Sequence, residues 1–345
     1  MEEAGVIDWT GAQSHLLLNP RMPAGEREAL ERAVPDLPAH VFVGTSGSTG
    51  AVKLVALSKD AILASAAAVN GRLEARAADV WCCVLPTFHV GGLGIHARAH
   101  LTGSRVISMP WDPHAFAATE ATLASLVPAQ VHDLVAAGLR PPPNLRAILV
   151  GGGAFESLNA PGWPVLASYG MSECASTVAV EGELLPHLEA RSEDEGRLAF
   201  RGASLLTGYA TVDGRFVDPK VDGWFVSEDV GSVDGRRLAV RGRTGDFVKI
   251  GGESVDLTRL DRILREIAGD AAAIVAVPDA RLGHTIELAT TVDDVTIVDV
   301  FNARVMPFER IRRVHRVASI PRSPLGKLLR HHVILSREDG EGSPA

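Results

Sequence analysis

Short apolar runs alternate with longer alanine-rich stretches along the first half of the chain. The stretches at about 58–71, 92–102, 114–124 and 129–138 predict helices. The apolar runs between and beside them predict buried strands: Val41–Val43, Trp81–Leu85, Arg105–Ser108, Arg146–Val150 and Pro164–Ala167. Strands that alternate with helices form a largely parallel sheet covered by helices. The pattern therefore predicts an α/β fold for this part of the chain.

The sequence pattern changes at about Arg197, where short β-like segments separated by Gly- and Asp-containing turns begin. These segments are Arg197–Arg201, Arg215–Val217, Trp224–Val226 and Arg237–Val240, and they predict a small antiparallel or barrel-like subdomain. Beyond a polar boundary at Arg241–Asp246, a new series of elements predicts a compact α+β domain. Its expected elements are helices at 257–267 and 297–304 and strands at Ala273–Val277, 286–291 and 313–318. Residues 336–345 are expected to form a disordered tail.

The composition indicates a globular enzyme. The 345 residues are enough for two domains, and the apolar fraction of 46% argues against a disordered or fibrous chain. A net charge of -8 argues against general nucleic-acid binding, so an anionic ligand would need individually placed cations. The first residues lack a basic region, and the uncharged stretch Val80–Ala97 carries Pro86 and three glycines. We therefore expect no signal peptide, no membrane insertion and a cytoplasmic location.

Cysteine usage indicates no disulfide or metal role. The three cysteines, Cys82, Cys83 and Cys174, are too few for a disulfide framework and lack the spacing of a metal site. We expect buried thiols in a reducing compartment.

The segment Thr45–Lys53, Thr-Ser-Gly-Ser-Thr-Gly-Ala-Val-Lys, predicts a phosphate-binding loop. It follows an apolar strand and precedes Ser58, a suitable N-cap for the helix at 58–71. Glycines let backbone amides converge on an anion, hydroxyls add donors, and the lysine adds a mobile positive charge. A nucleotide P-loop requires Gly-Lys-Ser/Thr in succession, whereas Ala51 and Val52 separate Gly50 from Lys53 here. The loop is therefore of another kind.

Five further segments accompany the loop in a fixed order. They are Leu85–Gly92, Tyr169–Glu173, Gly223–Asp229, Gly242–Glu253 and Pro321–Lys327. Together with the loop they resemble the core motifs of the acyl-adenylate-forming (AMP-binding) superfamily, which includes acyl-CoA synthetases, peptide-synthetase adenylation domains and luciferases. The resemblance runs from about residue 40 to 330. It implies that a carboxylate attacks the α-phosphate of ATP, that pyrophosphate leaves, and that the acyl group then passes to a thiol. Such chemistry depends on positioning and charge neutralisation.

The resemblance also assigns residues to ATP and Mg²⁺. The β- and γ-phosphates would be held by Thr45, Ser46, Gly47, Ser48, Thr49, Gly50 and Lys53. The adenine side would be formed by Gly151, Gly152, Gly153, Ser168, Tyr169, Gly170, Met171 and Ser172, with Tyr169 stacking on the base. Glu173 would bind Mg²⁺. Asp229 would accept hydrogen bonds from the ribose hydroxyls, Arg243 would support the ribose and the α-phosphate, and Lys327 would bridge the carboxylate and the α-phosphate.

The position of Lys327 implies a domain rotation between the two half-reactions. In the superfamily the small domain turns about a hinge residue, which corresponds to Asp246, and Gly251 and Gly252 would then face the pantetheine arm of coenzyme A. We therefore expect a large domain at 1–241, a hinge at 242–246 and a small domain at 247–335.

Three segments narrow the resemblance to the o-succinylbenzoate–CoA ligases of menaquinone biosynthesis: Gly94–Arg98, Ser125–Gln130 and Ser172–Thr177. Only about forty residues precede the phosphate loop, and we expect a short form of this ligase type. The acid carries a second, aromatic carboxylate, which needs a cation or strong donors in an apolar pocket. The resemblance assigns this task to Arg98, with Ser176 and Thr177 as donors and Phe88 and His89 beside the acyl group. His89, as a gate of the acyl pocket, is expected among the catalytic residues together with Lys327 and Glu173.

The sequence alone leaves several alternatives open. Arg98 could be a helix-surface arginine, and His89 a core histidine bonded to backbone carbonyls. The enzyme could activate another aryl or short-chain acid, or load a carrier-protein thiol, or be an inactive homologue that only binds. The expected partners are a small carboxylate, ATP, Mg²⁺ and coenzyme A, without nucleic acid, and a homodimer is left open.

Overall fold

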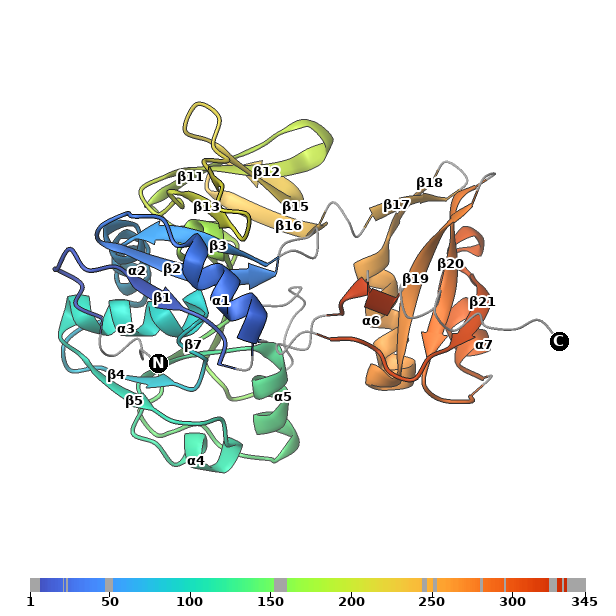
Figure 1. The fold of residues 1–345 in the computed structure, drawn as a ribbon. Coiled ribbons are helices and arrows are strands. Elements are labelled where there is room, and N and C mark those ends of the chain that lie inside the picture. Colours follow the sequence, from blue (N-terminus) through green and yellow to red (C-terminus); the bar gives the residue numbers. More distant parts are fainter. Residues whose placement is uncertain are drawn as a thin grey trace. The chain divides into compact units, whose positions relative to one another are not determined.

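The computed structural model describes residues 7–20, 22, 24–46, 52–151, 160–243, 247–250, 253–279, 282–294, 296–322, 328–330 and 332–333. The chain divides into two compact units, which are treated separately below (Figure 1). The first unit comprises Met1–Ser227 with Gly231–Val240, and the second comprises Glu228–Val230 with Arg241–Ala345.

An eleven-stranded mixed sheet contains the parallel part of the fold. Its strand order is β11-β12-β15-β16-β10-β9-β8-β7-β6-β4-β5. The parallel strands are β4 (Val80–Cys83), β5 (Arg105–Ser108), β6 (Leu123–Leu126), β7 (Ala147–Val150) and β8 (Val165–Met171). The sheet continues through β9 (Ser176–Val180), which is antiparallel to β8, to β10 (Glu183–Leu184), β11 (Leu188–Ser192), β12 (Arg197–Gly202), β15 (Phe225–Asp234) and β16 (Arg237–Arg243). An α/β sheet is therefore present, as expected.

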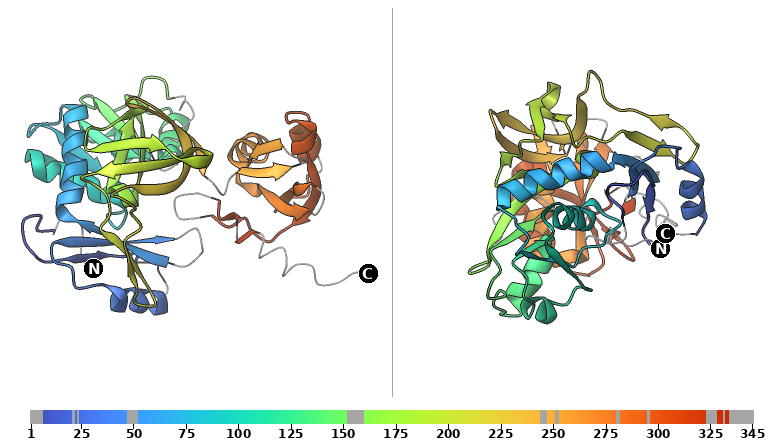
Figure 2. Two further views of the ribbon diagram at one scale, coloured as in Figure 1. Left: turned by 90° about the horizontal axis from the view of Figure 1, so that it is seen from above. Right: turned by 90° about the vertical axis from the view of Figure 1, so that its left-hand side faces the viewer.

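Helices cover this sheet. They are α2 (Lys59–Leu73), α3 (Val90–Thr102), α4 (Pro113–Ala117) and α5 (Pro128–Ala136). Ser58 caps α2 as predicted, since its hydroxyl accepts a hydrogen bond from the Ala61 amide at 3.1 Å. Helix α2, light blue in Figure 2, packs against α3, and both pack against β9. No helix in the described ranges is long and apolar enough to cross a membrane.

A second, five-stranded sheet has the order β1-β2-β3-β13-β14. Its strands are β1 (His15–Leu17), β2 (His40–Ser46), β3 (Val52–Ser58), β13 (Gly208–Thr211) and β14 (Phe216–Val217). Alternate residues face opposite sides. Phe42, Leu54 and Ala210 pack with Leu30 of α1 (Ala24–Ala33), while the neighbouring valines face α2 and α3.

Three sequence expectations were wrong in part. The residues between the phosphate loop and Ser58 form strand β3, so the loop joins a β-hairpin and the preceding strand is not part of the parallel sheet. The helix expected at 114–124 ends at Ala117, and Leu123–Leu126 is a strand buried on both faces. Such a run cannot be told from a buried helical turn by its pattern. The β-rich segment forms no separate barrel, because most of its strands extend the large sheet.

The second unit is built on a smaller sheet. Its strands are β17 (Phe247–Ile250), β18 (Glu253–Asp256), β19 (Ala272–Asp279), β20 (Gly283–Thr290) and β21 (Ile311–Arg316), and its helices are α6 (Leu257–Ala268) and α7 (Thr296–Asn302). Among the described residues there are also the single-turn helices η2 (Ser172–Cys174) and η3 (Asp194–Gly196) in the first unit and η5 (Gly269–Ala271) and η6 (Pro307–Glu309) in the second. Leu260 and Phe301 from the two helices pack on Ile274 and Leu288 of the sheet. This is the predicted α+β core, whereas the expected tail lies outside the described residues.

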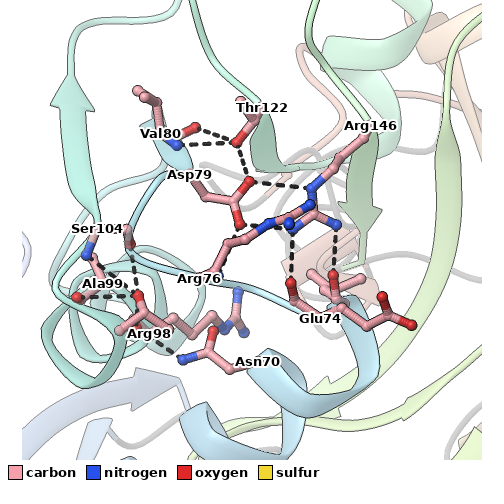
Figure 3. Close-up of polar contacts among 12 residues, drawn as sticks. Asn70, Glu74, Arg76, Asp79, Val80, Arg98, Ala99, Ser104, Thr122 and Arg146 are labelled. Carbon is pink, nitrogen blue, oxygen red and sulfur yellow. Dashed lines mark hydrogen bonds and ion pairs between the residues drawn. The ribbon is translucent and has the colours of Figure 1, made fainter.

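An ion pair between the buried Asp79 and the partly exposed Arg146 joins the amino ends of three adjacent parallel strands (Figure 3). Asp79, Thr122 and Arg146 each directly precede a strand, β4, β6 and β7 respectively. Arg146 donates to both Asp79 carboxylate oxygens, at 3.1 and 2.8 Å, and the Thr122 hydroxyl donates to one of them at 2.7 Å. Burial alone would raise the pKa of Asp79, but these hydrogen bonds lower it to about 2. The network stabilises the edge of the sheet that is opposite the candidate site.

The cysteines are buried free thiols, as expected. Burial raises the pKa of Cys82 to about 12 and that of Cys83 to about 11, so neither forms a thiolate near neutral pH. Both side chains belong to the packing of β4 against its neighbours.

Candidate active site

The candidate site lies where the parallel strands end. In an open α/β sheet the loops at the carboxyl ends of the strands are the usual place for a ligand. Ser125 lies near the end of β6, Gly151 follows β7, and Gly170 to Glu173 end β8 and form η2. The segment Leu85–Gly92, whose glycines lie in the first turn of α3, follows β4 in the same way.

Arg98 lies fully buried on α3, with 2% of its surface exposed. Its Nη1 donates to the Ser125 hydroxyl at 3.1 Å. Its Nη2 donates to the Thr177 hydroxyl at 3.1 Å and to the Ser176 hydroxyl at 3.4 Å. Gly94, one turn earlier, leaves room for this arrangement, since a Cβ there would lie 3.3 Å from both Nη2 and the Ser176 oxygen. The alternative of a helix-surface arginine is therefore wrong.

Among the residues that the structure describes, none of the hydrogen-bonding partners of Arg98 carries a negative charge. Within the described residues, its hydrogen-bonding partners are neutral hydroxyls, and its Nε has no hydrogen-bonding partner. Burial lowers the pKa of Arg98 to about 10, which still leaves the guanidinium protonated at neutral pH. A buried charge without a counter-charge costs several kcal/mol. The site is therefore suited to an anion that enters from outside.

His89 caps the amino end of α3 without a hydrogen bond from its side chain to the helix. Its ring lies 4.6 Å from the Phe88 ring, between centroids. Burial lowers the pKa of His89, which favours the neutral imidazole. The structure gives its ring no bond to a backbone carbonyl among the described residues, which argues against the alternative of a core histidine held by such bonds.

Thr45 and Lys53 face each other across the β2–β3 hairpin that carries the phosphate loop. The Thr45 hydroxyl is buried and has no hydrogen-bonding partner among the described residues. The Lys53 ammonium lies 3.5 Å from the centre of the Tyr209 ring. Gly47, Ser48, Thr49, Gly50 and the side chain of Ser46 lie outside the described residues.

Glu173 supplies the one carboxylate of η2. The Tyr209 hydroxyl donates to its Oε1 at 2.9 Å. In the described part of the chain, no three His, Cys, Asp or Glu side chains cluster as a metal site made of protein alone would require. Mg²⁺ commonly takes only one or two carboxylates and completes its shell with phosphate oxygens and water. A single carboxylate near a phosphate loop fits that ion.

Gly151 and Gly170 allow the chain segments around Tyr169 to pack closely against one another. A Cβ at Gly170 would overlap the Ser176 carbonyl oxygen, and a bulge interrupts the β8–β9 pairing at this position. A Cβ at Gly151 would lie 2.9 Å from the Ser168 hydroxyl. The half-buried Tyr169 ring lies 6.2 Å from the Phe200 ring, between centroids, at 41°. Thus Gly151, Ser168 and Tyr169 lie together.

The remaining predicted residues belong to the second unit or lie outside the described residues. Asp229 is buried on β15 and is grouped with the second unit. Arg243 ends β16, but its side chain lies outside the described residues, as do Gly152, Gly153, Asp246, Gly251, Gly252 and Lys327.

Two residues of the arrangement were missed by sequence reasoning. Ser125 opens a segment already singled out by resemblance, so its hydroxyl could have been chosen. Tyr209 could have been noticed as one of only two tyrosines. Its position beside Lys53 and Glu173 depends on strand pairing that no local pattern reveals.

This combination of fold and site is typical of an AMP-binding enzyme. The AMP-binding enzyme family matches residues 28–210, more than half of the chain, and the chain therefore belongs to this family. The resemblance drawn from the motifs is confirmed.

Its relatives include ligases of one particular type. The chain is 31% identical to the 2-succinylbenzoate–CoA ligase of Salmonella typhimurium, over 77% of this chain and 62% of the relative. It is 32% identical to the Escherichia coli enzyme of the same name, over 70% of this chain and 56% of the relative. The chain thus spans less than two thirds of the length of these two relatives.

Solved structures confirm the predicted fold class. An o-succinylbenzoate–CoA synthetase (MenE) from Bacillus subtilis, in complex with its acyl-adenylate intermediate OSB-AMP, aligns with a TM-score of 0.76 at 23% identity. The alignment covers 85% of this chain and 68% of that one. A MenE variant from E. coli with bound OSB-AMS aligns with a TM-score of 0.75 at 23% identity, covering 95% and 88%.

Proposed function

We propose that the protein is an ATP-dependent o-succinylbenzoate–CoA ligase that works through an acyl adenylate. The observation that carries this proposal is the buried guanidinium of Arg98, whose described hydrogen-bonding partners are the neutral hydroxyls of Ser125, Ser176 and Thr177. The named relatives support the same acid.

In the first half-reaction, an oxygen of the aliphatic carboxylate attacks the α-phosphorus of ATP. The bond to the β-phosphate breaks and pyrophosphate leaves with its electron pair. Thr45, Ser46, Gly47, Ser48, Thr49, Gly50 and Lys53 bind the β- and γ-phosphates, and Lys327 stabilises the charge that develops at the α-phosphate. Glu173 holds Mg²⁺, which neutralises phosphate charge when it is bound.

The nucleotide is oriented by the residues around β8. Tyr169 stacks on adenine, with Ser168, Gly170, Met171 and Ser172 and the glycines Gly151, Gly152 and Gly153 allowing close approach. Asp229 and Arg243 hold the ribose. The close packing at Gly170 and Gly151, where a side chain would collide with neighbouring atoms, supports this assignment of the nucleotide site.

The aromatic carboxylate is held by Arg98. A guanidinium donates short, strong hydrogen bonds to a carboxylate, and burial increases the strength of these bonds. Ser176 and Thr177 orient the guanidinium, while Phe88 and the neutral His89 form the apolar wall of the acyl pocket.

In the second half-reaction, the sulfur of coenzyme A attacks the acyl carbon and AMP leaves. We propose that residues 247–335 rotate about Asp246 within the hinge 242–246 to replace Lys327 by the pantetheine arm beside Gly251 and Gly252. The division of the chain at Arg241 supports a large domain of residues 1–241 that is distinct from the small one.

An acid panel tests the proposal. Pyrophosphate exchange into ATP is measured with o-succinylbenzoate and with 4-oxo-4-phenylbutanoate, which keeps the keto acid but lacks the aromatic carboxylate. We expect exchange with the first acid to be roughly 100-fold more efficient, since one buried charge pair is at stake. Equal efficiency would favour another aryl acid, and no exchange with any acid would favour an inactive binding homologue.

Thiol and assembly assays complete the test. Thioester formation with coenzyme A, but not with a carrier-protein thiol, is expected. A cytoplasmic location agrees with the supply of ATP and coenzyme A there. Light scattering on the purified protein measures its molar mass and shows whether it is a monomer or a homodimer.

A further inference from the structure

Tyr209 contacts both Lys53, which is assigned to the phosphates, and Glu173, which is assigned to Mg²⁺. Lys53 Nζ lies 3.5 Å from the centre of its ring, and its hydroxyl donates to Glu173 Oε1 at 2.9 Å. One side chain therefore contacts a cation with its face and a carboxylate with its hydroxyl. The contact with Glu173 requires the hydroxyl, because a phenylalanine would fill the same volume and keep the ring contact with Lys53 but could not donate to Glu173.

Strand pairing determines this geometry. Lys53 is paired with Thr211, and Val55 with Tyr209, across β3 and β13. Residues two apart on a strand share a face, so Lys53 and Tyr209 are diagonal neighbours on one side of the sheet. Thr45 lies on the same side, because it is paired with Lys53 across the hairpin.

Backbone hydrogen bonds hold Glu173 to the same strand. The Leu206 amide donates to the Glu173 carbonyl at 2.8 Å, just before β13 begins. The next amide, that of Thr207, donates to the Ala56 carbonyl of β3 at 2.8 Å. The distances among Lys53, Tyr209 and Glu173 are therefore set by backbone contacts and not by mobile side chains alone.

The arrangement also keeps the two opposite charges apart. A direct ion pair between Lys53 and Glu173 would neutralise both groups and would have to break before ATP and its metal could bind. The electron-rich ring face stabilises the ammonium without neutralising it. The hydroxyl occupies one carboxylate oxygen and leaves the second for a cation.

We propose that Tyr209 is a positioning residue for the metal–polyphosphate complex: its hydroxyl orients Glu173 toward the cation and its ring orders Lys53 for the phosphates. This inference rests on the roles of Lys53 and Glu173 in the proposed function. It adds to that function a residue that contacts neither substrate and acts through both groups.

The experiment measures ATP binding by calorimetry with and without divalent cation, and Mn²⁺ binding to the ATP complex by electron paramagnetic resonance. Tyr209→Phe removes only the hydroxyl, and Tyr209→Leu removes the ring as well. Val217→Thr is the control, because Val217 is paired with Tyr209 on the outer strand β14 and is exposed. Thermal unfolding of each variant reports on the fold.

For Tyr209→Phe we expect Mn²⁺ affinity of the ATP complex to fall about tenfold, the usual effect of losing a hydrogen bond to a charged group, with metal-free ATP affinity unchanged. For Tyr209→Leu we expect metal-free ATP affinity to fall as well, about threefold, because Lys53 loses its ring contact. Val217→Thr should match the wild type in both measurements.

Unchanged Mn²⁺ affinity in Tyr209→Phe would overturn the inference. Equal weakening with and without metal would also overturn it, because that is the signature of a general structural defect. These binding measurements need no acid. A wild type that binds metal–ATP but activates no o-succinylbenzoate would therefore refute the proposed function alone.

Discussion

Replacement of Arg98 by methionine should affect substrate use and protein stability differently. The variant keeps much of the side-chain volume and removes the charge. Its effect follows from the surroundings of the guanidinium, which is 2% exposed and donates to the hydroxyls of Ser125, Ser176 and Thr177.

The magnitude for substrate can be worked out from this burial. Truncating one partner of a buried, hydrogen-bonded charge pair costs about 2–5 kcal/mol. A loss of about 3 kcal/mol corresponds to roughly 100-fold in kcat/KM. For 4-oxo-4-phenylbutanoate, which lacks the second carboxylate, we expect no loss, and the preference between the two acids should disappear.

The expected effect on the protein without substrate is different. Burial of the charge costs several kcal/mol, and the hydrogen bonds from the charged guanidinium, about 1.5–3 kcal/mol each, offset that cost. We therefore expect the free energy of unfolding of Arg98→Met to lie within about 2 kcal/mol of the wild-type value. Urea unfolding measures it in the absence of ligand.

A surface arginine provides the control. Arg105 lies on β5 with 58% of its side chain exposed and pairs with Glu120 at 2.6 Å. Exposed pairs contribute little, so Arg105→Met should change neither acid preference nor stability appreciably. The reasoning is refuted if Arg98→Met retains wild-type kcat/KM for o-succinylbenzoate, or if it loses activity with both acids in equal measure.

Three further outcomes are expected. Asp79 has a pKa lowered from 3.8 to about 2, so its contribution of about 2 kcal/mol is present above pH 4 and lost as the pH falls from 4 toward 2; urea unfolding of Asp79→Asn should lack this slope. Gly170→Ala should destabilise by about 3 kcal/mol or more through overlap with the Ser176 carbonyl, whereas Gly71→Ala, in open space on α2, should be neutral or stabilising in thermal unfolding. Asp246→Pro should impair thioester formation far more than pyrophosphate exchange, and equal loss of both would contradict the hinge.

Local signals accounted for much of the fold. The cap at Ser58, the helix after the glycine-rich segment at 85–92, and the helix at 257–267 follow from residue types within a few positions of one another. Strands β3 and β6 were missed for a shared reason. A short run such as Leu123–Leu126, buried on both faces, has no alternation to distinguish it from helix.

Some residues of the site could likewise be predicted from the sequence, and others could not. The phosphate loop and Glu173 were chosen from the sequence because their chemistry lies in short contiguous motifs. The burial of Arg98 among neutral hydroxyls, and the place of Tyr209 between Lys53 and Glu173, were decided only by the tertiary structure. Both depend on residues tens of positions apart, which α3 packing and β3–β13 pairing bring together. Sequence alone therefore determined which chemical groups the protein carries, and tertiary contacts decided which of them are buried and which side chains hold them in place.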